Sequence, residues 1–182
     1  FDHPGFILFS SGTTGAPKCI VHSAAGVLLK DLAEQRIHLD ITPGDRVCYY
    51  TTAGWMMWNW LVMVLGTGAT VVLADGQPMY PEPDRLLRLV ADEKLTFLGV
   101  SAKYIESLRQ HSVSMSPHEL ASLRTMASTG SPLAPELFDY VYEHVCSSVH
   151  LASISGGTDI CGCFVLGVPT EPVLRGEIQG PA

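Results

Sequence analysis

The residues best suited to chemistry form one short run of small, hydroxyl-bearing and glycine residues that ends on a lysine. In order they are Ser10, Ser11, Gly12, Thr13, Thr14, Gly15, Ala16, Pro17 and Lys18. Glycines let the backbone approach a ligand closely, and consecutive amide N–H groups form a concave site for anions. The hydroxyls donate further hydrogen bonds, and the lysine supplies a mobile positive charge. This composition favours a polyphosphate ligand, although an ordinary flexible turn uses the same residue types.

A Walker A loop is the first alternative for such a run, because it also binds phosphates through glycines and a lysine. That loop has the pattern Gly-x4-Gly-Lys-Ser/Thr, so that a helix begins at the phosphates. Here Lys18 comes three residues after Gly15 and directly follows Pro17, which has no backbone N–H to donate. The spacing therefore counts against a P-loop kinase or ATPase.

Two later loops carry polar residues of the same kind. The first spans Ser128–Leu133, and the second spans Ser155–Gly162 and contains Thr158 and Asp159. A threonine hydroxyl can hold a phosphate oxygen as charge builds there, and a carboxylate is the hard oxygen ligand that Mg²⁺ prefers. Taken singly, each loop is also compatible with a common turn: a proline at a helix start in the first, and an Asx-type turn in the second.

The glycine-rich run resembles the phosphate-loop signature of the adenylate-forming enzymes, a family of acyl-CoA synthetases, luciferases and peptide-synthetase adenylation domains. Those enzymes usually have glycine after the lysine, where this chain has Cys19. The resulting string PKCIVHS is similar to the acetoacetyl-CoA synthetase subfamily. The strings GWMMWNW, STGSPL, SISGGTD and RGEIQ are similar to it too, so the resemblance extends from Gly5 to Gly180.

This resemblance implies an ATP site built from all three loops. It places the polyphosphate on Ser10, Ser11, Gly12, Thr13, Thr14, Gly15 and Lys18, and the adenine against Gly130, Ser131 and Pro132. It places Gly156, Gly157, Thr158 and Asp159 around the α-phosphate and its Mg²⁺ ion, with Lys18 and Thr158 as the catalytic residues. The family has glutamate where this chain has the shorter Asp159. A water-mediated contact to Mg²⁺ is therefore an alternative to direct binding.

The same resemblance implies a pocket for the acid formed by Trp55, Met56, Met57, Thr129 and Gly156. In the related acetyl-CoA synthetases, a Gly-Trp pair followed by two small residues contributes to the acetate pocket. A tryptophan two residues before the motif threonine closes it. This chain has two methionines at the first place and Gly156 at the second, so we expect a wider pocket that admits acetoacetate. For Trp58 and Trp60, burial in a helix remains the alternative reading.

The implied reaction converts acetoacetate, ATP and CoA to acetoacetyl-CoA, AMP and pyrophosphate. The ribose-binding aspartate motif, the hinge and the lysine-bearing C-terminal domain of the family would lie beyond residue 182. We therefore expect residues 1–182 to be a single internal fragment of the AMP-binding (adenylation) domain that cannot complete the reaction alone. Another short oxo or branched acid and a non-catalytic nucleotide-binding module remain open as alternatives.

The elements that would position these loops alternate between strands and helices. Apolar, β-branched runs predict buried strands at Phe6–Phe9, Val47–Thr51, Thr70–Leu73, Thr96–Val100, Arg124–Ala127 and Val149–Ile154. Helical spacing predicts helices at Ala24–His38, capped by Ser23, at Arg85–Ala91 and at Leu137–Val145. This alternation predicts an α/β fold with a mainly parallel sheet and flanking helices, whose ligands bind beyond the carboxyl ends of the strands.

His22 lies close to the glycine-rich run and could be mistaken for a general base. A carboxylate is already ionised at neutral pH, so its adenylation needs no base. We expect His22 to pack or to fix a loop instead.

Composition limits the other possibilities. The chain has 182 residues, of which 47% are hydrophobic and 16% charged, and its formal net charge is -7 without a basic run, which argues against nucleic acid as a partner. Its apolar stretches are shorter than a bilayer span requires, and its opening residues do not have the pattern of a secretory leader, so we expect neither membrane insertion nor secretion. Five cysteines without CxxC spacing favour reduced thiols in a cytoplasmic protein over a disulfide framework or a zinc site.

Overall fold

The computed structural model describes residues 1–10 and 15–182. Its centre is a five-stranded sheet in the order β4-β3-β5-β6-β7, in which every neighbouring pair is parallel. The strands are β3 (Arg46–Tyr49), β4 (Thr70–Val71), β5 (Phe97–Ser101), β6 (Thr125–Thr129) and β7 (His150–Ser153). The predicted class, an α/β fold with a mainly parallel sheet, is confirmed.

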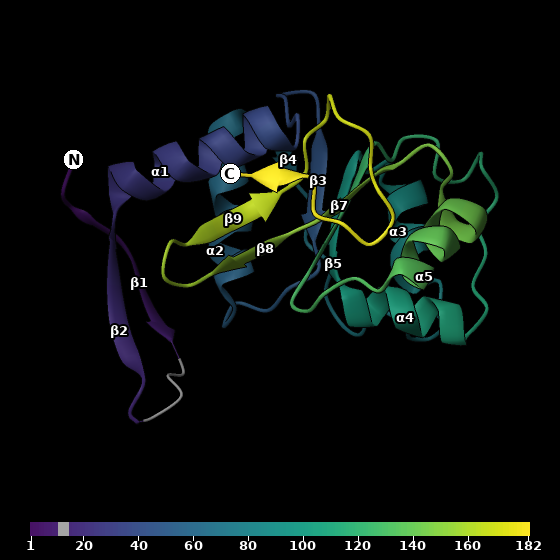
Figure 1. Ribbon diagram of the computed structural model, residues 1–182, viewed down its shortest axis with the longest axis horizontal. Helices are drawn as coiled ribbons and strands as arrows, with labels where there is room; N and C mark the ends of the chain where they lie inside the picture. Colours follow the sequence, from purple (N-terminus) through teal and green to yellow (C-terminus); the bar gives the residue numbers. More distant parts are fainter. Residues whose placement is uncertain (11–14) are drawn as a thin grey trace.

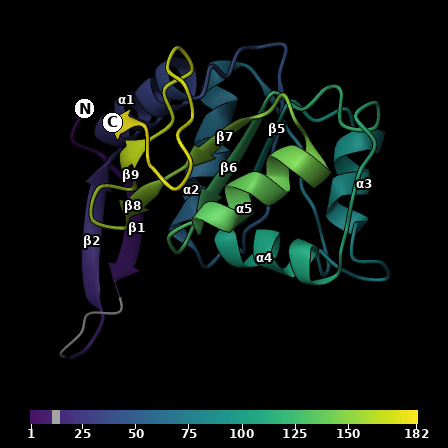
Figure 2. The ribbon, with the colours of Figure 1, turned by 45° about the vertical axis from the view of Figure 1, so that its right-hand side comes forward.

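Helices cover both faces of this sheet (Figures 1 and 2). One face carries α3 (Arg85–Asp92), α4 (Ala102–Gln110), and α5 (Pro135–Tyr140) with its π-helical extension η3 (Val141–Val145). Their buried side chains form one core with the strands, including Leu87, Leu98, Ile105, Met126 and Phe138. The helix α4, capped by the Ser101 hydroxyl, is absent from the sequence prediction.

The other face carries α2 (Met56–Met63) and its 3-10 extension η2 (Val64–Thr67). The segment that follows α1 (Ala24–Ala33) and its π-helical continuation η1 (Glu34–His38) packs on the same face. As predicted, Ser23 caps α1, because its hydroxyl accepts a hydrogen bond from the Gly26 N–H at 3.3 Å. A second core lies here, with Tyr49, Trp60 and Phe97 in mutual aromatic contact. The helices on the two faces of the sheet are therefore packed into two separate hydrophobic cores.

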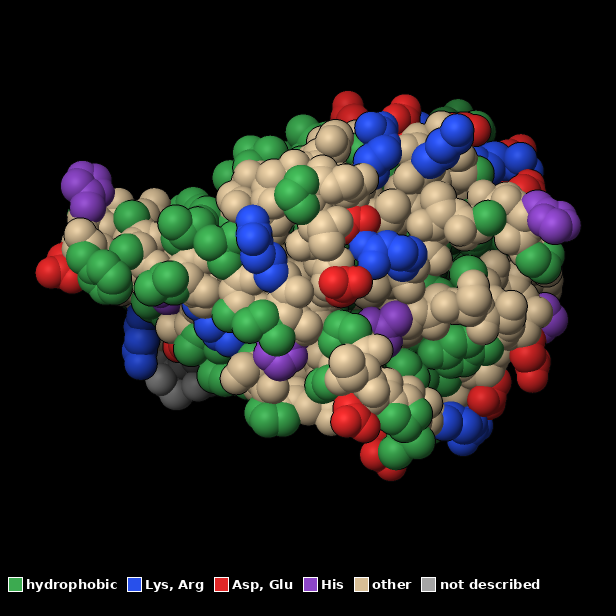
Figure 3. All heavy atoms as spheres, turned by 90° about the horizontal axis from the view of Figure 1, so that it is seen from above, with side chains coloured by type: hydrophobic (Ala, Val, Ile, Leu, Met, Phe, Trp, Pro, Cys, Tyr) green, Lys and Arg blue, Asp and Glu red, His purple; other side chains and the backbone are tan. Residues whose placement is uncertain are grey.

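The glycine-rich run does not follow a strand of this sheet. It connects β1 (Pro4–Ser10) to β2 (Lys18–Ser23), an antiparallel hairpin that extends away from the body of the molecule (Figure 1). The predicted strand at Phe6–Phe9 is present, but its predicted burial is wrong, because a two-stranded ribbon leaves one face open. Ile7 and Phe9 are 57% and 65% exposed. Hydrophobic side chains accordingly gather at the hairpin end of the surface in Figure 3.

The third polar loop is part of another small sheet. The strands β8 (Ser155–Gly157), β9 (Gly162–Leu166) and β10 (Gly180–Pro181) are antiparallel, in the order β10-β9-β8. The expected loop after β7 is therefore a β-hairpin whose turn carries Thr158 and Asp159. Within the described residues, no helix is both long and apolar enough to cross a membrane.

Candidate active site

The turn between β8 and β9 is held tightly by backbone contacts. The N–H of Ile160 donates to the Gly157 carbonyl, and the N–H of Cys161 to the Thr158 carbonyl, both at 3.3 Å. Cys161 has a φ of 49°, a backbone conformation in the left-handed region that residues other than glycine rarely adopt. The turn presents Thr158 half-buried and Asp159 exposed.

His22 of β2 connects this turn to the glycine-rich hairpin. Its Nε2 donates a hydrogen bond of 2.8 Å to the Thr158 carbonyl oxygen, across 136 positions of the sequence. Because a carbonyl only accepts, Nε2 carries a hydrogen in this contact. The contact agrees with the expected loop-fixing role of His22.

The larger of two neighbouring cavities, about 580 Å³, brings together most of the residues predicted for the acid and the phosphates. Its lining is Phe9, Ser10, Gly54, Trp55, Met56, Met57, Thr129, Gly130, Gly156, Thr158, Asp159 and Cys163. Met57 is buried at the start of α2, whereas Trp55 is 56% exposed at the rim. Asp159 is the single charged side chain among the described residues that line this cavity.

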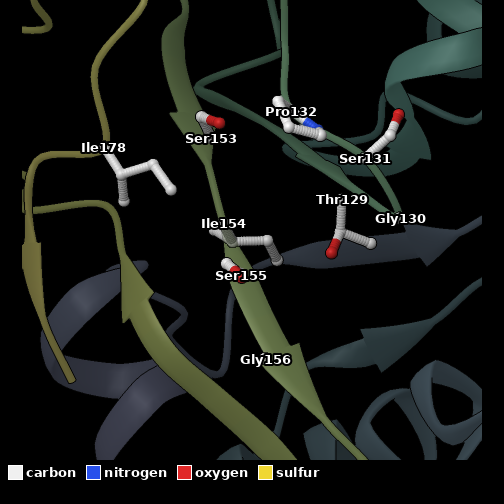
Figure 4. A pocket seen from close by; sticks show the side chains of 9 residues that line it. All are labelled: Thr129, Gly130, Ser131, Pro132, Ser153, Ile154, Ser155, Gly156 and Ile178. Carbon is white, nitrogen blue, oxygen red and sulfur yellow. The ribbon is translucent and has the colours of Figure 1, made fainter. Parts of the chain in front are cut away.

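The second cavity, about 390 Å³, lies between the loop after β6 and the segment from β7 to β8 (Figure 4). Gly130, Ser131 and Pro132 form one side of it, and Ile178 reaches in from the segment that leads to β10. Gly130 has a φ of 89°, which only glycine adopts without strain, so the turn after β6 depends on this residue type. A flat ring would meet small side chains and exposed backbone here.

The two cavities share three lining residues, Thr129, Gly130 and Gly156. They lie at the carboxyl ends of β6 and β7, as expected for a ligand site of an open α/β sheet. A ligand in one cavity is therefore directly next to a ligand in the other.

At Gly156 the structure differs from the sequence prediction, because a side chain there would point toward β9. A Cβ built on it would lie 2.0 Å from the Gly162 carbonyl oxygen and 2.7 Å from the Cys163 Cα. Its missing side chain therefore allows β8 and β9 to approach each other. The idea that a missing indole at this position widens the cavity is not supported, because a side chain here would first enter the backbone of β9.

The glycine-rich run is described in part. Ser10 lines the larger cavity, while Gly15 and Lys18 are exposed on the hairpin and line neither cavity. The predicted phosphate ligands Ser11, Gly12, Thr13 and Thr14 lie outside the described residues. Gly157 is half-buried beside the Asp159 carboxylate, whose Oδ2 would be 3.5 Å from a Cβ at that glycine.

Seven lining residues were not among the predicted site residues: Phe9, Gly54, Ser153, Ile154, Ser155, Cys163 and Ile178. Phe9 and Cys163 belong to apolar runs whose exposure cannot be read from the sequence. Ile178 lies in the RGEIQ string, which pointed to a subfamily without indicating a role for this residue.

Metal binding at the site would rest on Asp159. No group of three or more His, Cys, Asp or Glu side chains placed to hold a metal ion occurs in the described ranges. One carboxylate still fits Mg²⁺, which usually keeps several waters and binds one or two carboxylates together with substrate phosphates.

Burial, with Asp31 and Glu34 nearby, raises the pKa of Cys161 to about 12 and also raises that of Cys163, so these thiols remain protonated.

Comparison with known proteins adds a family and close relatives. A family model described as "AMP-binding enzyme" matches residues 2–181. The acetoacetyl-coenzyme A synthetase of Rhizobium meliloti (strain 1021) is 57% identical over 182 residues, which are 100% of this chain and 28% of that protein. A malonamoyl-CoA synthetase of Penicillium aethiopicum is 46% identical over 193 residues, covering 98% of this chain and 27% of that protein.

Among solved structures, an acetoacetyl-CoA synthetase from Streptomyces lividans matches with a TM-score of 0.90 and 43% identity. The match covers 99% of this chain and 28% of that chain. The chain thus spans a little over a quarter of the relatives that it matches.

Proposed function

Because the chain belongs to the AMP-binding enzyme family, we propose that the protein is an ATP-dependent ligase that joins acetoacetate to CoA. The observation that carries this proposal is the junction of the two cavities at Thr129, Gly130 and Gly156. An acid in the larger cavity and the adenosine part of ATP in the smaller one would meet there. Proximity of this kind lowers the barrier of a reaction between two bound substrates.

In the proposed first step, an acetoacetate oxygen attacks the α-phosphorus of ATP and pyrophosphate leaves. The Thr158 hydroxyl would hold an α-phosphate oxygen as negative charge builds on it. The His22 contact supports this role, since it fixes the backbone of the same residue at 2.8 Å. Ser10 at the cavity, Lys18 on the hairpin and the glycine-rich sequence between them would bind the departing phosphates.

Adenine would lie in the smaller cavity against Gly130, Ser131 and Pro132. Asp159 would hold Mg²⁺, with Gly157 leaving room beside its carboxylate. The ion would supply charge neutralisation for the phosphates when bound. Because aspartate is shorter than the glutamate of the family, a contact from Asp159 to the ion through a bridging water is the alternative to direct binding.

In the proposed second step, the sulfur of CoA attacks the acyl carbon, AMP leaves, and the thiol proton passes to solvent. Trp55, Met56, Met57 and Thr129 would contact the acid. The two methionines support a longer acid than acetate because they are flexible and apolar. The names of the relatives support acetoacetate as the acid. Five cysteines without CxxC spacing support a cytoplasmic place for the reaction.

A second candidate, activation of a different short acid, is favoured by the similarity to the malonamoyl-CoA synthetase. A non-catalytic nucleotide-binding module is the candidate from another class. The full-length protein should release pyrophosphate, not phosphate, from ATP, and only when acetoacetate is added. Tight ATP binding without acid-dependent pyrophosphate release would favour the module, and release of phosphate would overturn the ligase proposal.

A further inference from the structure

A buried carboxylate lies behind the larger cavity without lining it. Glu34, in η1, has an exposed fraction of 0% and is not among the described residues that line the cavity. Burying an ionised group costs free energy unless it is paired and fully hydrogen-bonded. The partners of Glu34 therefore indicate what its carboxylate holds in place.

The two carboxylate oxygens are hydrogen-bonded to α2 and β9, and each of these elements contributes lining residues to the cavity. Oε2 accepts a hydrogen bond of 3.0 Å from the Trp60 indole N–H in α2. Oε1 accepts one of 2.8 Å from the Cys163 backbone N–H in β9. Glu34 is thus a bridge between α2 and β9.

The α2 wall reaches the cavity through the turn before Trp60. The indole is fully buried, with ring centroids 5.8 Å from Tyr49 and 5.9 Å from Phe97. Met56 and Met57, which precede Trp60 by about one helical turn, line the cavity. Since the indole cannot move independently of this core, its position sets the position of the two methionines.

The β9 wall reaches the cavity through Cys163, which also pairs with Gly156 of β8. A Cβ at Gly162 would lie 2.4 Å from the Glu34 Oε1, so the carboxylate occupies the space that a side chain would need. This close packing fixes the separation between η1 and β9.

Lys30 supplies the opposite charge. Its Nζ lies 2.9 Å from the Glu34 Oε1 and donates a hydrogen bond of 2.8 Å to the Cys163 carbonyl. The same residue of β9 is therefore held at both its N–H and its C=O. The neighbouring Asp31 is also fully buried, and burial, together with Glu34, raises its pKa to about 8, so it stays neutral at pH 7.

We propose that Glu34 is a positioning residue that fixes the distance between α2 and β9 and thereby limits the length of acid that the larger cavity accepts. This inference rests on the proposed function. Charge-assisted hydrogen bonds are directional, so they hold two walls at a set distance better than apolar contacts do.

The test compares E34Q with the unchanged full-length enzyme, using acetoacetate and 3-oxohexanoate as acids. Glutamine keeps the volume but turns an NH2 group toward one of the two N–H donors, so one hydrogen bond is lost. We expect kcat/KM for acetoacetate to fall about 10-fold, with a smaller loss for 3-oxohexanoate and less than about a twofold change in the KM for ATP. W60F, which removes the indole donor but keeps the carboxylate, should shift the ratio of the two acids in the same direction.

The matched control is D45N. Asp45 is a buried carboxylate bonded to Arg124 at 2.6 Å, at the amino end of β3 and away from the cavities. D45N should lower the melting temperature without changing the ratio of kcat/KM for the two acids.

The outcomes separate the two proposals. If the unchanged enzyme shows no acid-dependent pyrophosphate release, the proposed function fails. If that enzyme is active but W60F and any folded E34Q keep its acid ratio, the positioning role fails. It also fails if D45N shifts the ratio as much as they do. If E34Q does not fold, W60F decides alone.

Discussion

The Nε2 atom of His22 and the carbonyl oxygen of Thr158 lie 2.8 Å apart, which ties the strand that follows the glycine-rich run to the turn that carries Thr158 and Asp159. The neutral ring with a hydrogen on Nε2 and the doubly protonated ring both donate to a carbonyl. The contact links two motifs that are far apart in the sequence.

Removing this donor should slow adenylation. H22F loses one hydrogen bond, and we expect its kcat for pyrophosphate release to fall about 10-fold. H22Q can place an amide N–H near the same carbonyl and should retain activity within about threefold of the original. Equal losses in H22F and H22Q would instead point to a packing role for the ring.

A substitution at Asp159 should change the dependence on Mg²⁺. D159N keeps the size but loses the negative charge, so the Mg²⁺ concentration for half-maximal activity should rise about 10-fold or more. D159E restores the charge with a longer reach and should need no more Mg²⁺ than the original. Titrating Mg²⁺ at saturating ATP measures this, and an unchanged requirement in D159N would remove Asp159 from the metal site.

Gly156 should tolerate no side chain. G156A places a methyl group against the Gly162 carbonyl, so we expect it to destabilise the protein by about 1–3 kcal/mol and to lower activity toward acetate and acetoacetate by similar factors. Melting temperature and kcat/KM for both acids are the measurements. A shift toward acetate with unchanged stability would show instead that the position controls acid length directly.

Stability should depend on pH through Asp31. Burial is the largest cause of the rise in its pKa from 3.8 to about 8, with a contribution from Glu34. Between these two pH values the folded protein binds a proton that the unfolded chain releases. The Asp31 contribution to stability is therefore complete below pH 4 and is lost as pH rises toward 8, by up to about 1.4 kcal/mol per pH unit.

D31N cannot ionise, so its melting temperature should fall less steeply between pH 5 and pH 8 than that of the original protein. Both proteins are measured in the same buffers, and the difference in slope is the readout. Parallel curves would show that Asp31 is already ionised in the folded protein at pH 5.

The parallel sheet could be predicted because its strands are apolar runs separated by segments with helical spacing. Phe6–Phe9 is equally apolar, yet it forms half of an open hairpin, since an apolar run does not reveal which partner covers it. The direction in which a side chain at Gly156 would point depends on the pairing of this residue with Cys163. Contacts such as Glu34 with Trp60 depend on how η1 and α2 lie against each other, for which residue spacing contains no signal.

The proposed identity of the acid is tested most directly by acid-dependent pyrophosphate release from the full-length enzyme. The series is acetate, propionate, butyrate, acetoacetate and 3-hydroxybutyrate at equal concentrations. We expect kcat/KM to be highest for acetoacetate, because the flexible, apolar side chains of Met56 and Met57 line the cavity and favour a longer acid than acetate. A kcat/KM for acetate equal to or above that for acetoacetate would contradict the account.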